Sequence, residues 1–165
     1  TMLNIIRAGI EQCDLIKSMA EIVFPYTYEQ ILSSTQIEYM MQWMYSSQSL
    51  RQQMNEGHVY FIAYLDGEAV GYVSLQQEDE HTFHLQKIYV LPNFQRRGIG
   101  DALFSHAEDY IRASYPSPWH LRLNVNRANS AQGFYRRRGL TIEETGDFDI
   151  GNGFFMNDYI MGVDI

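Results

Sequence analysis

The amino-acid sequence predicts an α/β fold of the α+β type, in which helices pack on a mixed, mostly antiparallel sheet. Three observations lead to this prediction. Apolar residues recur at helical spacing in the first third of the chain, residues 59–90 alternate with the period of two that is typical of strands, and residues 88–125 have the pattern strand, helix, strand. Because a strand–helix–strand crossover joins parallel strands, one parallel pair is expected.

The first 58 residues are expected to form one strand and three helices. Residues 3–7 are the strand candidate. Apolar spacing predicts a first helix that Pro25 ends, a methionine-rich second helix around residues 37–44, and a third over residues 50–56. The methionine and aromatic side chains of the second helix are candidates for the core, with a place in a substrate pocket as the alternative for some of them.

Residues 59–90 predict three antiparallel strands. Asp66-Gly67 lies between two alternating runs and is typical of a two-residue hairpin turn, and the third run covers residues 82–90. The turn Glu78–His81 is acidic, and His84 follows it. No further ligand stands at a recognisable spacing, so we expect a solvated hairpin tip here and no metal site.

The rest of the chain is expected to complete the sheet. The predicted elements are a helix over 97–114, a connection over 115–118, a strand over 121–125, and a closing hairpin of strands 141–148 and 154–163. These elements bring the sheet to about seven strands. We expect a single domain over residues 1–165.

Composition restricts the class of protein. The chain has 165 residues, of which 45% are hydrophobic, and no apolar run approaches the ~20 residues that a membrane span requires. The net charge of -8 argues against nucleic acid as a partner. Cys13 is the only cysteine, so we expect a small buried hydrophobe with no internal disulfide. A soluble protein without a membrane partner and with a cytoplasmic location is expected.

The charges are distributed unevenly. Residues 87–138 hold nine Lys and Arg against three acidic residues, residues 1–86 hold three against eleven, and residues 139–165 hold none against six. This pattern suits an anionic cofactor bound by the middle of the chain and a cationic substrate attracted by the rest. An ordinary solubilising surface is the alternative explanation.

The segment Gln95–Gly100, between a strand and a helix, has the chemistry of an anion site. Its two glycines allow close approach to the backbone, and the first helical turn offers free N–H groups. Arg96 and Arg97 add positive charge to that of the helix dipole. A glycine turn with exposed arginines is the alternative. Two other nucleotide motifs fit less well, because Asp101-Ala102 stands in place of Lys-Ser/Thr and Leu103 in place of a third glycine.

The same segment resembles the signature of the GNAT superfamily of acyl-CoA-dependent N-acyltransferases, Gln/Arg-x-x-Gly-x-Gly/Ala. A second block, Asn126–Leu140, is similar to that family's second signature, Asn-x-x-Ala-x-x-Phe-Tyr-x-x-x-Gly-Phe. Here the interval from Asn129 to the alanine is one residue shorter, and Leu140 replaces the phenylalanine. The blocks stand in the family's order, and the resemblance extends over about the last two-thirds of the chain.

The resemblance implies the GNAT fold, with a splayed parallel strand pair, and acetyl-CoA (coenzyme A) as co-substrate without a metal. The pyrophosphate would lie at the loop and the pantetheine arm between the splayed strands. Val90 would donate its N–H to the thioester carbonyl, and Tyr135 would lie beside the sulfur. A packed aromatic is the alternative for Tyr135. The implied cofactor-binding positions are Ile88, Val90, Gln95, Arg96, Arg97, Gly98, Ile99, Gly100, Asn129, Phe134 and Tyr135.

The amine acceptor requires a proton acceptor. Many family members carry a glutamate before the leucine of the third antiparallel strand, where this chain has His84. His84 is therefore the candidate catalytic base, and a strand histidine without a role is the alternative. Asp101, where the family often has Lys, Ser or Thr, should point away from the phosphates. Further candidates for the base, acting through water, are His58, Tyr60, Glu38 and Asp158.

These observations predict an acetyl-CoA-dependent N-acetyltransferase. The acceptor is expected to be a small, cationic primary amine such as a polyamine or diamine, which attacks the thioester directly, and the layout is similar to bacterial polyamine acetyltransferases. One alternative is a catalytically silent acyl-CoA-binding regulatory module. Another is a GNAT enzyme that acts on protein N-termini or lysines. The acceptor's identity, longer acyl donors and the oligomeric state, a homodimer included, stay open.

Overall fold

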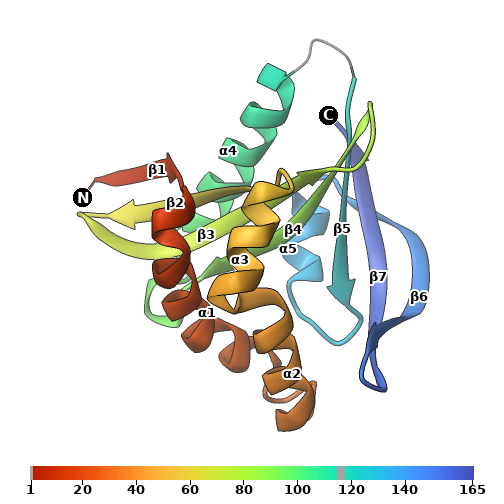
Figure 1. Ribbon diagram of the computed structural model, residues 1–165. Helices are drawn as coiled ribbons and strands as arrows, with labels where there is room; N and C mark the ends of the chain where they lie inside the picture. The colour runs from red at the N-terminus through yellow and green to blue at the C-terminus, as the bar shows by residue number, and fades with distance from the viewer. Residues whose placement is uncertain (1, 115–117) are drawn as a thin grey trace.

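The computed structural model describes residues 2–114 and 118–165. It contains a seven-stranded sheet in the order β1-β2-β3-β4-β5-β7-β6 (Figure 1). The strands are β1 (Leu3–Arg7), β2 (Val59–Leu65), β3 (Glu68–Gln77), β4 (Thr82–Val90), β5 (His120–Asn126), β6 (Thr141–Gly151) and β7 (Phe154–Asp164). The helices are α1 (Cys13–Tyr28), α2 (Ser34–Tyr45), α3 (Ser47–Asn55), α4 (Ile99–Ser114) and α5 (Gln132–Arg137), with short 3₁₀ turns η1 (Ile10–Gln12) and η2 (Pro92–Phe94).

The strand pairing confirms the predicted fold. All neighbouring strands are antiparallel except β4 and β5, which are parallel and are joined through α4. The β2–β3 hairpin turns at Asp66 and Gly67, whose φ angles of 50° and 86° are those of the predicted two-residue turn. Residues 115–117, which belong to the expected connection after α4, lie outside the described residues.

Helices cover both faces of the sheet. The first three helices lie on one face, where buried residues such as Phe24, Met40 and Leu50 pack against Tyr60 and Tyr72 of the sheet. On the other face, α4 packs its apolar side against β2, β3 and β4. Cys13 is a free thiol that is buried in the core between the first three helices and the sheet, as predicted.

The structure corrects the predicted end of the first helix. Pro25 was expected to end it, but α1 continues to Tyr28 with Pro25 in its last turns. A proline removes only one backbone donor. Here the Glu29 N–H donates to the Pro25 carbonyl at 2.8 Å, so the backbone hydrogen bonds continue past the proline, and the Thr27 hydroxyl adds a side-chain bond to the Val23 carbonyl at 2.7 Å. The extra turn carries Tyr28 toward the centre of the sheet.

Two irregularities shape the middle of the sheet. Ser74 of β3 faces Lys87 of β4, whereas the next residue, Leu75, faces Leu85, so Gln86 is an extra residue in β4. Such a bulge bends the strand and increases its twist. The parallel pairing of β4 with β5 extends only from Thr82–His120 to His84–Arg122. Beyond these three pairs, just before the bulge, the two strands separate.

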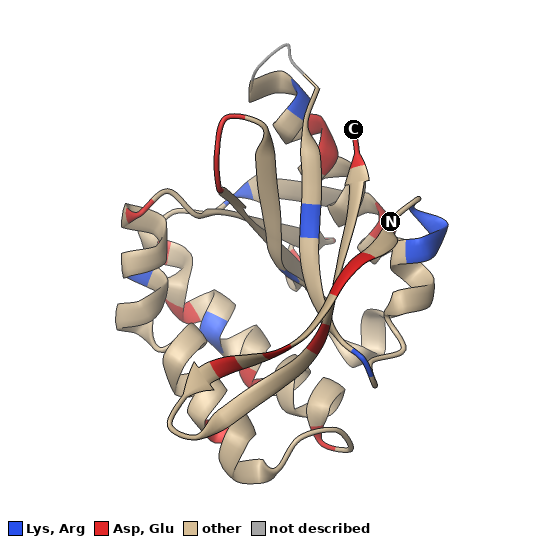
Figure 2. Ribbon diagram, turned by 90° about the vertical axis from the view of Figure 1, so that its right-hand side faces the viewer, with Lys and Arg blue, Asp and Glu red and all other residues tan. Residues whose placement is uncertain are grey.

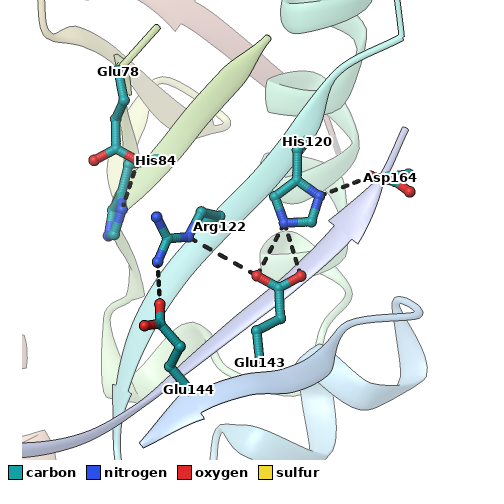
Figure 3. A network of polar contacts seen from close by, with 7 residues as sticks. All are labelled: Glu78, His84, His120, Arg122, Glu143, Glu144 and Asp164. Carbon is teal, nitrogen blue, oxygen red and sulfur yellow. Dashed lines mark hydrogen bonds and ion pairs between the residues drawn. The ribbon is translucent and has the colours of Figure 1, made fainter. Parts of the chain in front are cut away.

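Ion pairs hold β5 to the two strands beyond it (Figure 3). His120 lies between Glu143 and Asp164, with 2.8 Å from each ring nitrogen to a carboxylate oxygen, and Arg122 contacts Glu144 at 2.8 Å. Burial opposes the protonation of His120, but the hydrogen bonds of the two carboxylates outweigh it and raise its pKa. These contacts fasten β5 to β6 and β7, on the side away from β4.

Acidic residues follow the outermost strand. Figure 2 shows Asp and Glu positions along β6, and these residues are Glu143, Glu144, Asp147 and Asp149.

Within residues 2–114 and 118–165, no helix has the length and apolar character needed to cross a membrane. In the same residues, no group of three or more His, Cys, Asp or Glu side chains is arranged as a metal site.

Candidate functional site

The separation of β4 from β5 opens a cavity of about 720 Å³, which we call the strand cavity. Its walls are the free halves of the two strands, the end of α1 and the segment that leads into α5. The lining residues include Tyr28, Glu29, Leu85, Lys87, Ile88, Tyr89, Val90, Gln95, Leu123, Asn124, Val125, Asn129, Phe134, Tyr135 and Arg137.

The free edge of β4 presents backbone groups to this opening. The Leu91 N–H donates to the Val70 carbonyl at 2.8 Å, so Leu91 faces β3. Because successive residues of a strand point their N–H and C=O groups to opposite sides, those of Val90, and of Ile88 two residues earlier, face the opening. The Gln95 side-chain amide donates to the Val90 carbonyl at 3.0 Å. The Val90 N–H lies on this same edge and is a donor directed at the opening.

The segment Gln95–Gly100 forms an exposed bend between η2 and α4. Arg96 and Gly98 have positive φ angles of 63° and 80°, which turn the backbone sharply. The first amide of α4 with a backbone acceptor is that of Ala102, which donates to the Gly98 carbonyl at 3.0 Å. The N–H groups just before it therefore have no intrahelical partner, as at any helix N-terminus. They adjoin a second cavity of about 400 Å³, the loop cavity.

Charged residues around the bend are arranged to leave it basic. The Asp101 carboxylate contacts Arg138 at 3.3 Å, and Arg138 also contacts Glu108 at 2.7 Å. Asp101 is thus drawn toward α5 and its charge is paired. Arg97 lies over the Phe94 ring at 5.3 Å, and Arg137 lines both the strand cavity and the loop cavity.

Tyr135 stands where the two cavities adjoin, together with Ile88, Val90 and Phe134. Its side chain is buried, and burial raises the pKa of its phenol. No described residue lies within hydrogen-bond distance of its hydroxyl, in contrast to Tyr28 and Tyr89, whose hydroxyls contact each other at 3.3 Å. The Tyr135 phenol is therefore a neutral donor without a partner in the described protein.

The second sequence block builds the end of the strand cavity. The Asn129 side-chain carbonyl accepts the Ala131 N–H at 2.9 Å and so fixes the chain where α5 begins. Phe134 packs edge-on against Phe104 of α4, with ring centres 6.0 Å apart. A Cβ on Gly100 would lie 3.7 Å from the Phe134 ring, so the bend and α5 are close neighbours.

Comparison with known proteins agrees with this geometry. A family model described as "Acetyltransferase (GNAT) domain" matches residues 24–154. The chain belongs to the GNAT acetyltransferase family. The resemblance seen in the two sequence blocks is thereby confirmed, and the match extends into α1, beyond the part of the chain that carried the resemblance.

Curated N-acetyltransferases match parts or most of the chain. An uncharacterized N-acetyltransferase of Lactobacillus delbrueckii is 33% identical over 92 residues, which cover 52% of this chain and 53% of that protein. The chain thus spans about half the length of this relative. A spermidine N(1)-acetyltransferase of Thermoplasma acidophilum is 26% identical over 153 residues, or 89% of this chain and 93% of that protein.

A solved N-acetyltransferase structure has the same fold over the full chain. The PaiA N-acetyltransferase of Thermoplasma acidophilum, crystallised in complex with coenzyme A, superposes with a TM-score of 0.85 at 23% identity and 100% coverage of both chains. At this identity the likeness concerns the fold, which matches the α/β architecture described above.

The structure does not bring His84 to the strand cavity. This residue pairs with Arg122 at the closed end of the parallel contact, and its Nδ1 lies 3.5 Å from Glu78 (Figure 3). Burial lowers the pKa of His84, and the neighbouring Glu78 partly offsets this. The other candidates for the base are also set apart. Among them, His58 lines a different cavity, Tyr60 is buried beneath α3, Glu38 is exposed on α2, and Asp158 is buried on β7.

Sequence reasoning missed three residues that line the strand cavity, namely Tyr28, Tyr89 and Lys87. Tyr28 was missed because the helix was expected to end at Pro25, and Tyr89 because an aromatic within a strand pattern is usually core. Lys87 did carry a signal. It is one of only two lysines in the chain and directly precedes the apolar run Ile88–Leu91, and the structure buries it to 7% exposure.

Proposed function

We propose that the protein is an acetyl-CoA-dependent N-acetyltransferase of small, cationic primary amines. The observation that supports this most directly is the junction of two cavities at Ile88, Val90, Phe134 and Tyr135. One cavity reaches the basic bend, where an anionic cofactor fits, and the other reaches the end of α1 and is wide enough for an acceptor. The reacting carbon would lie where they meet.

In this proposal the bend binds the pyrophosphate of coenzyme A. The free N–H groups at the start of α4 and the positive end of its dipole attract phosphate, and Arg96, Arg97 and Arg137 add charge. Asn129 adjoins the cofactor at the other strand. The pantetheine arm runs along the free edge of β4, where Ile88 and Val90 offer the backbone hydrogen bonds that β5 would otherwise make.

Two residues act at the thioester. The Val90 N–H stabilises negative charge on the carbonyl oxygen as the amine attacks, and a single such donor contributes about 10²–10³ in rate. The Tyr135 hydroxyl donates a hydrogen bond to the departing sulfur. A thiol ordinarily titrates near ~8.5 and a phenol near ~10. Because burial raises the pKa of Tyr135 further, we assign it hydrogen-bond donation and not full proton transfer.

The acceptor side of the site favours a cation. Glu29 lines the strand cavity, and Asp158 lies behind Asn124, whose amide contacts one carboxylate oxygen at 3.2 Å. The other Asp158 oxygen is buried and has no partner among the described residues, and burial raises the pKa of this carboxyl. Glu29, at the wall of the cavity, is placed to attract an ammonium group. An alkylamine with a pKa near ~10.4 is mostly protonated at pH 7, so about 4.6 kcal/mol is required to present it as a neutral nucleophile.

The function is tested with a panel of amines. Thiol release from acetyl-CoA is measured with diamines, polyamines, neutral hydroxylated amines and peptides with free N-termini or lysines. We expect saturable, amine-dependent release that is greatest with diamines or polyamines. Acetyl-CoA binding without release by any amine would favour the silent binding module, and release with peptides alone would favour a protein acetyltransferase.

Substitution of Gly98 tests the bend. Gly98→Ala forces a side chain into a φ of 80°, which costs about 1–2 kcal/mol and redirects the neighbouring amides. We expect the affinity for coenzyme A, measured by calorimetry, to fall about tenfold. Gly57→Ala is the matched control, since Gly57 has a φ of 98°, open space around its Cβ position and no place in either cavity. Equal affinities in both variants would remove the bend from the cofactor site.

Substitution of Tyr135 tests the leaving-group role. Tyr135→Phe keeps the ring and removes the donor, so kcat should fall roughly 10²-fold while the Kd of acetyl-CoA changes less than about threefold. Tyr110→Phe removes a hydroxyl from a tyrosine of α4 that packs on Phe61 outside both cavities, and should leave both constants unchanged. Turnover in Tyr135→Phe equal to that of the wild type would show that this hydroxyl takes no part in the chemistry.

A further inference from the structure

Lys87 connects the strand cavity with a separate cavity on the helical side of the sheet. It follows the bulge residue Gln86 in β4 and lines the strand cavity. It also lines a cavity of about 450 Å³ between α2, α3 and β4, which we call the helix cavity. Between these two spaces the side chain is only 7% exposed.

The amine of Lys87 is surrounded by neutral polar and aromatic groups. Its Nζ donates to Gln53 Oε1 at 2.8 Å and to the Tyr60 hydroxyl, and it lies 4.6 Å from the centre of the Tyr45 ring. Among the described residues no carboxylate lies within ion-pair distance of it. Burial without a counter-ion lowers the pKa of Lys87 to about 7. The titratable groups that face it or share the helix cavity are Tyr45 of α2, Tyr60 of β2, and Glu56 and His58 between α3 and β2.

Other ionisable side chains around the strand cavity are less suited to exchange protons at neutral pH. They are four tyrosines, Glu29 and Arg137. Phenols and guanidinium groups ordinarily keep their protons at pH 7, and carboxylates are ordinarily far weaker bases than amines. An amine held neutral for part of the time both accepts and releases a proton in this range, which is the requirement for a general base.

We propose that Lys87 accepts the proton that the acceptor ammonium must lose and delivers it to water in the helix cavity. This role rests on the proposed function. The neutral Nζ takes one proton from the ammonium, directly or through one water. The freed amine forms the C–N bond as the C–S bond breaks, and its second proton goes to the thiolate. Each turnover thus releases one proton to solvent, and Lys87 returns to its neutral form.

The surroundings of Lys87 suit both of its protonation states. When charged, it donates to Gln53 and the Tyr60 oxygen, and the Tyr45 ring stabilises the cation. When neutral, it accepts from the Tyr60 hydroxyl. On the far side His58 lines the helix cavity, and its buried Nδ1 has no partner among the described residues. A polar group is therefore available next to Lys87 on the way to water.

The pH dependence of turnover tests this role. With the preferred amine of the panel, kcat/KM of the wild type should rise through an ionisation near 7, in addition to the ionisation of the amine itself. Lys87→Met should lose this ionisation, with kcat/KM about 10²-fold lower at pH 7 and within about fourfold of the wild type at pH 10, where about a quarter of an amine with a pKa near ~10.4 is neutral. Trifluoroethylamine is neutral at pH 7 and has no such proton to lose before it attacks. With this amine, kcat/KM at pH 7 should therefore differ less than threefold between the wild type and Lys87→Met.

The chain offers a matched control and an independent measurement. Lys17→Met removes the only other lysine, which lies on α1 outside both cavities, and should keep the wild-type profile. Protein with isotope-labelled lysine gives one Nζ signal for each of the two lysines, and the signal that remains in Lys17→Met belongs to Lys87. In the wild type we expect this Lys87 signal to titrate near 7. This titration does not require Lys87→Met to fold.

Three outcomes would overturn the proposal. They are an unchanged pH profile in an active Lys87→Met variant, an equal loss at every pH and with both amines, and a Lys87 titration near the ~10.4 of an ordinary lysine. Absence of turnover by the wild type with every amine would instead overturn the proposed function, and the role of Lys87 with it.

Discussion

The parallel contact between β4 and β5 ends after His84 and Arg122, and the site depends on this short contact. A continuous ladder would consume the outward-facing backbone groups of Ile88 and Val90 and leave no space between the strands. The separation has identifiable causes on both sides. The bulge at Gln86 bends β4, while the ion pairs of His120 and Arg122 fasten β5 to β6 and β7. The unpaired edge is thereby held open as part of the fold.

The two signature blocks, Gln95–Gly100 and Asn126–Leu140, meet at the end of the opening that adjoins α4. The bend before α4 and the start of α5 meet where Gly100 lies against Phe134, and Arg138 reaches from α5 back to α4. Their basic residues therefore gather at one point, whereas the acidic residues of β6 and the buried Asp158 lie elsewhere. The uneven charge along the sequence thus corresponds to a separation in space.

Local patterns in the sequence were sufficient to predict most of the architecture. The Asp66-Gly67 turn, the alternation of β2 and β3, and the glycine bend before α4 depend on neighbouring residues, so each was visible. The end of α1 was not, because the loss of one N–H at Pro25 did not stop the helix, in which the Glu29 N–H still donates to the Pro25 carbonyl. The predicted start of α4 was also wrong, because the helix begins at Ile99 and not at Arg97.

The candidate site was predictable only in part. The bend and Tyr135 stand in motifs whose spacing carries information. The positions of His84 and Lys87 depend on strand register and on where the parallel pairing stops, which no local pattern encodes. Only Leu85 and the bulge residue Gln86 separate them in β4, yet His84 lies at the closed end beside Glu78, while Lys87 lines the opening.

We propose that the free edge of β4 and the bend before α4 bind the cofactor together. Hydrogen–deuterium exchange with and without coenzyme A measures this directly, since both contacts use backbone N–H groups. We expect slower exchange in the peptides that contain Ile88–Val90 and Gly98–Ala102, and no change in α2 and α3. Protection confined to the helix cavity, or unchanged exchange at both β4 and the bend under saturating coenzyme A, would contradict the account.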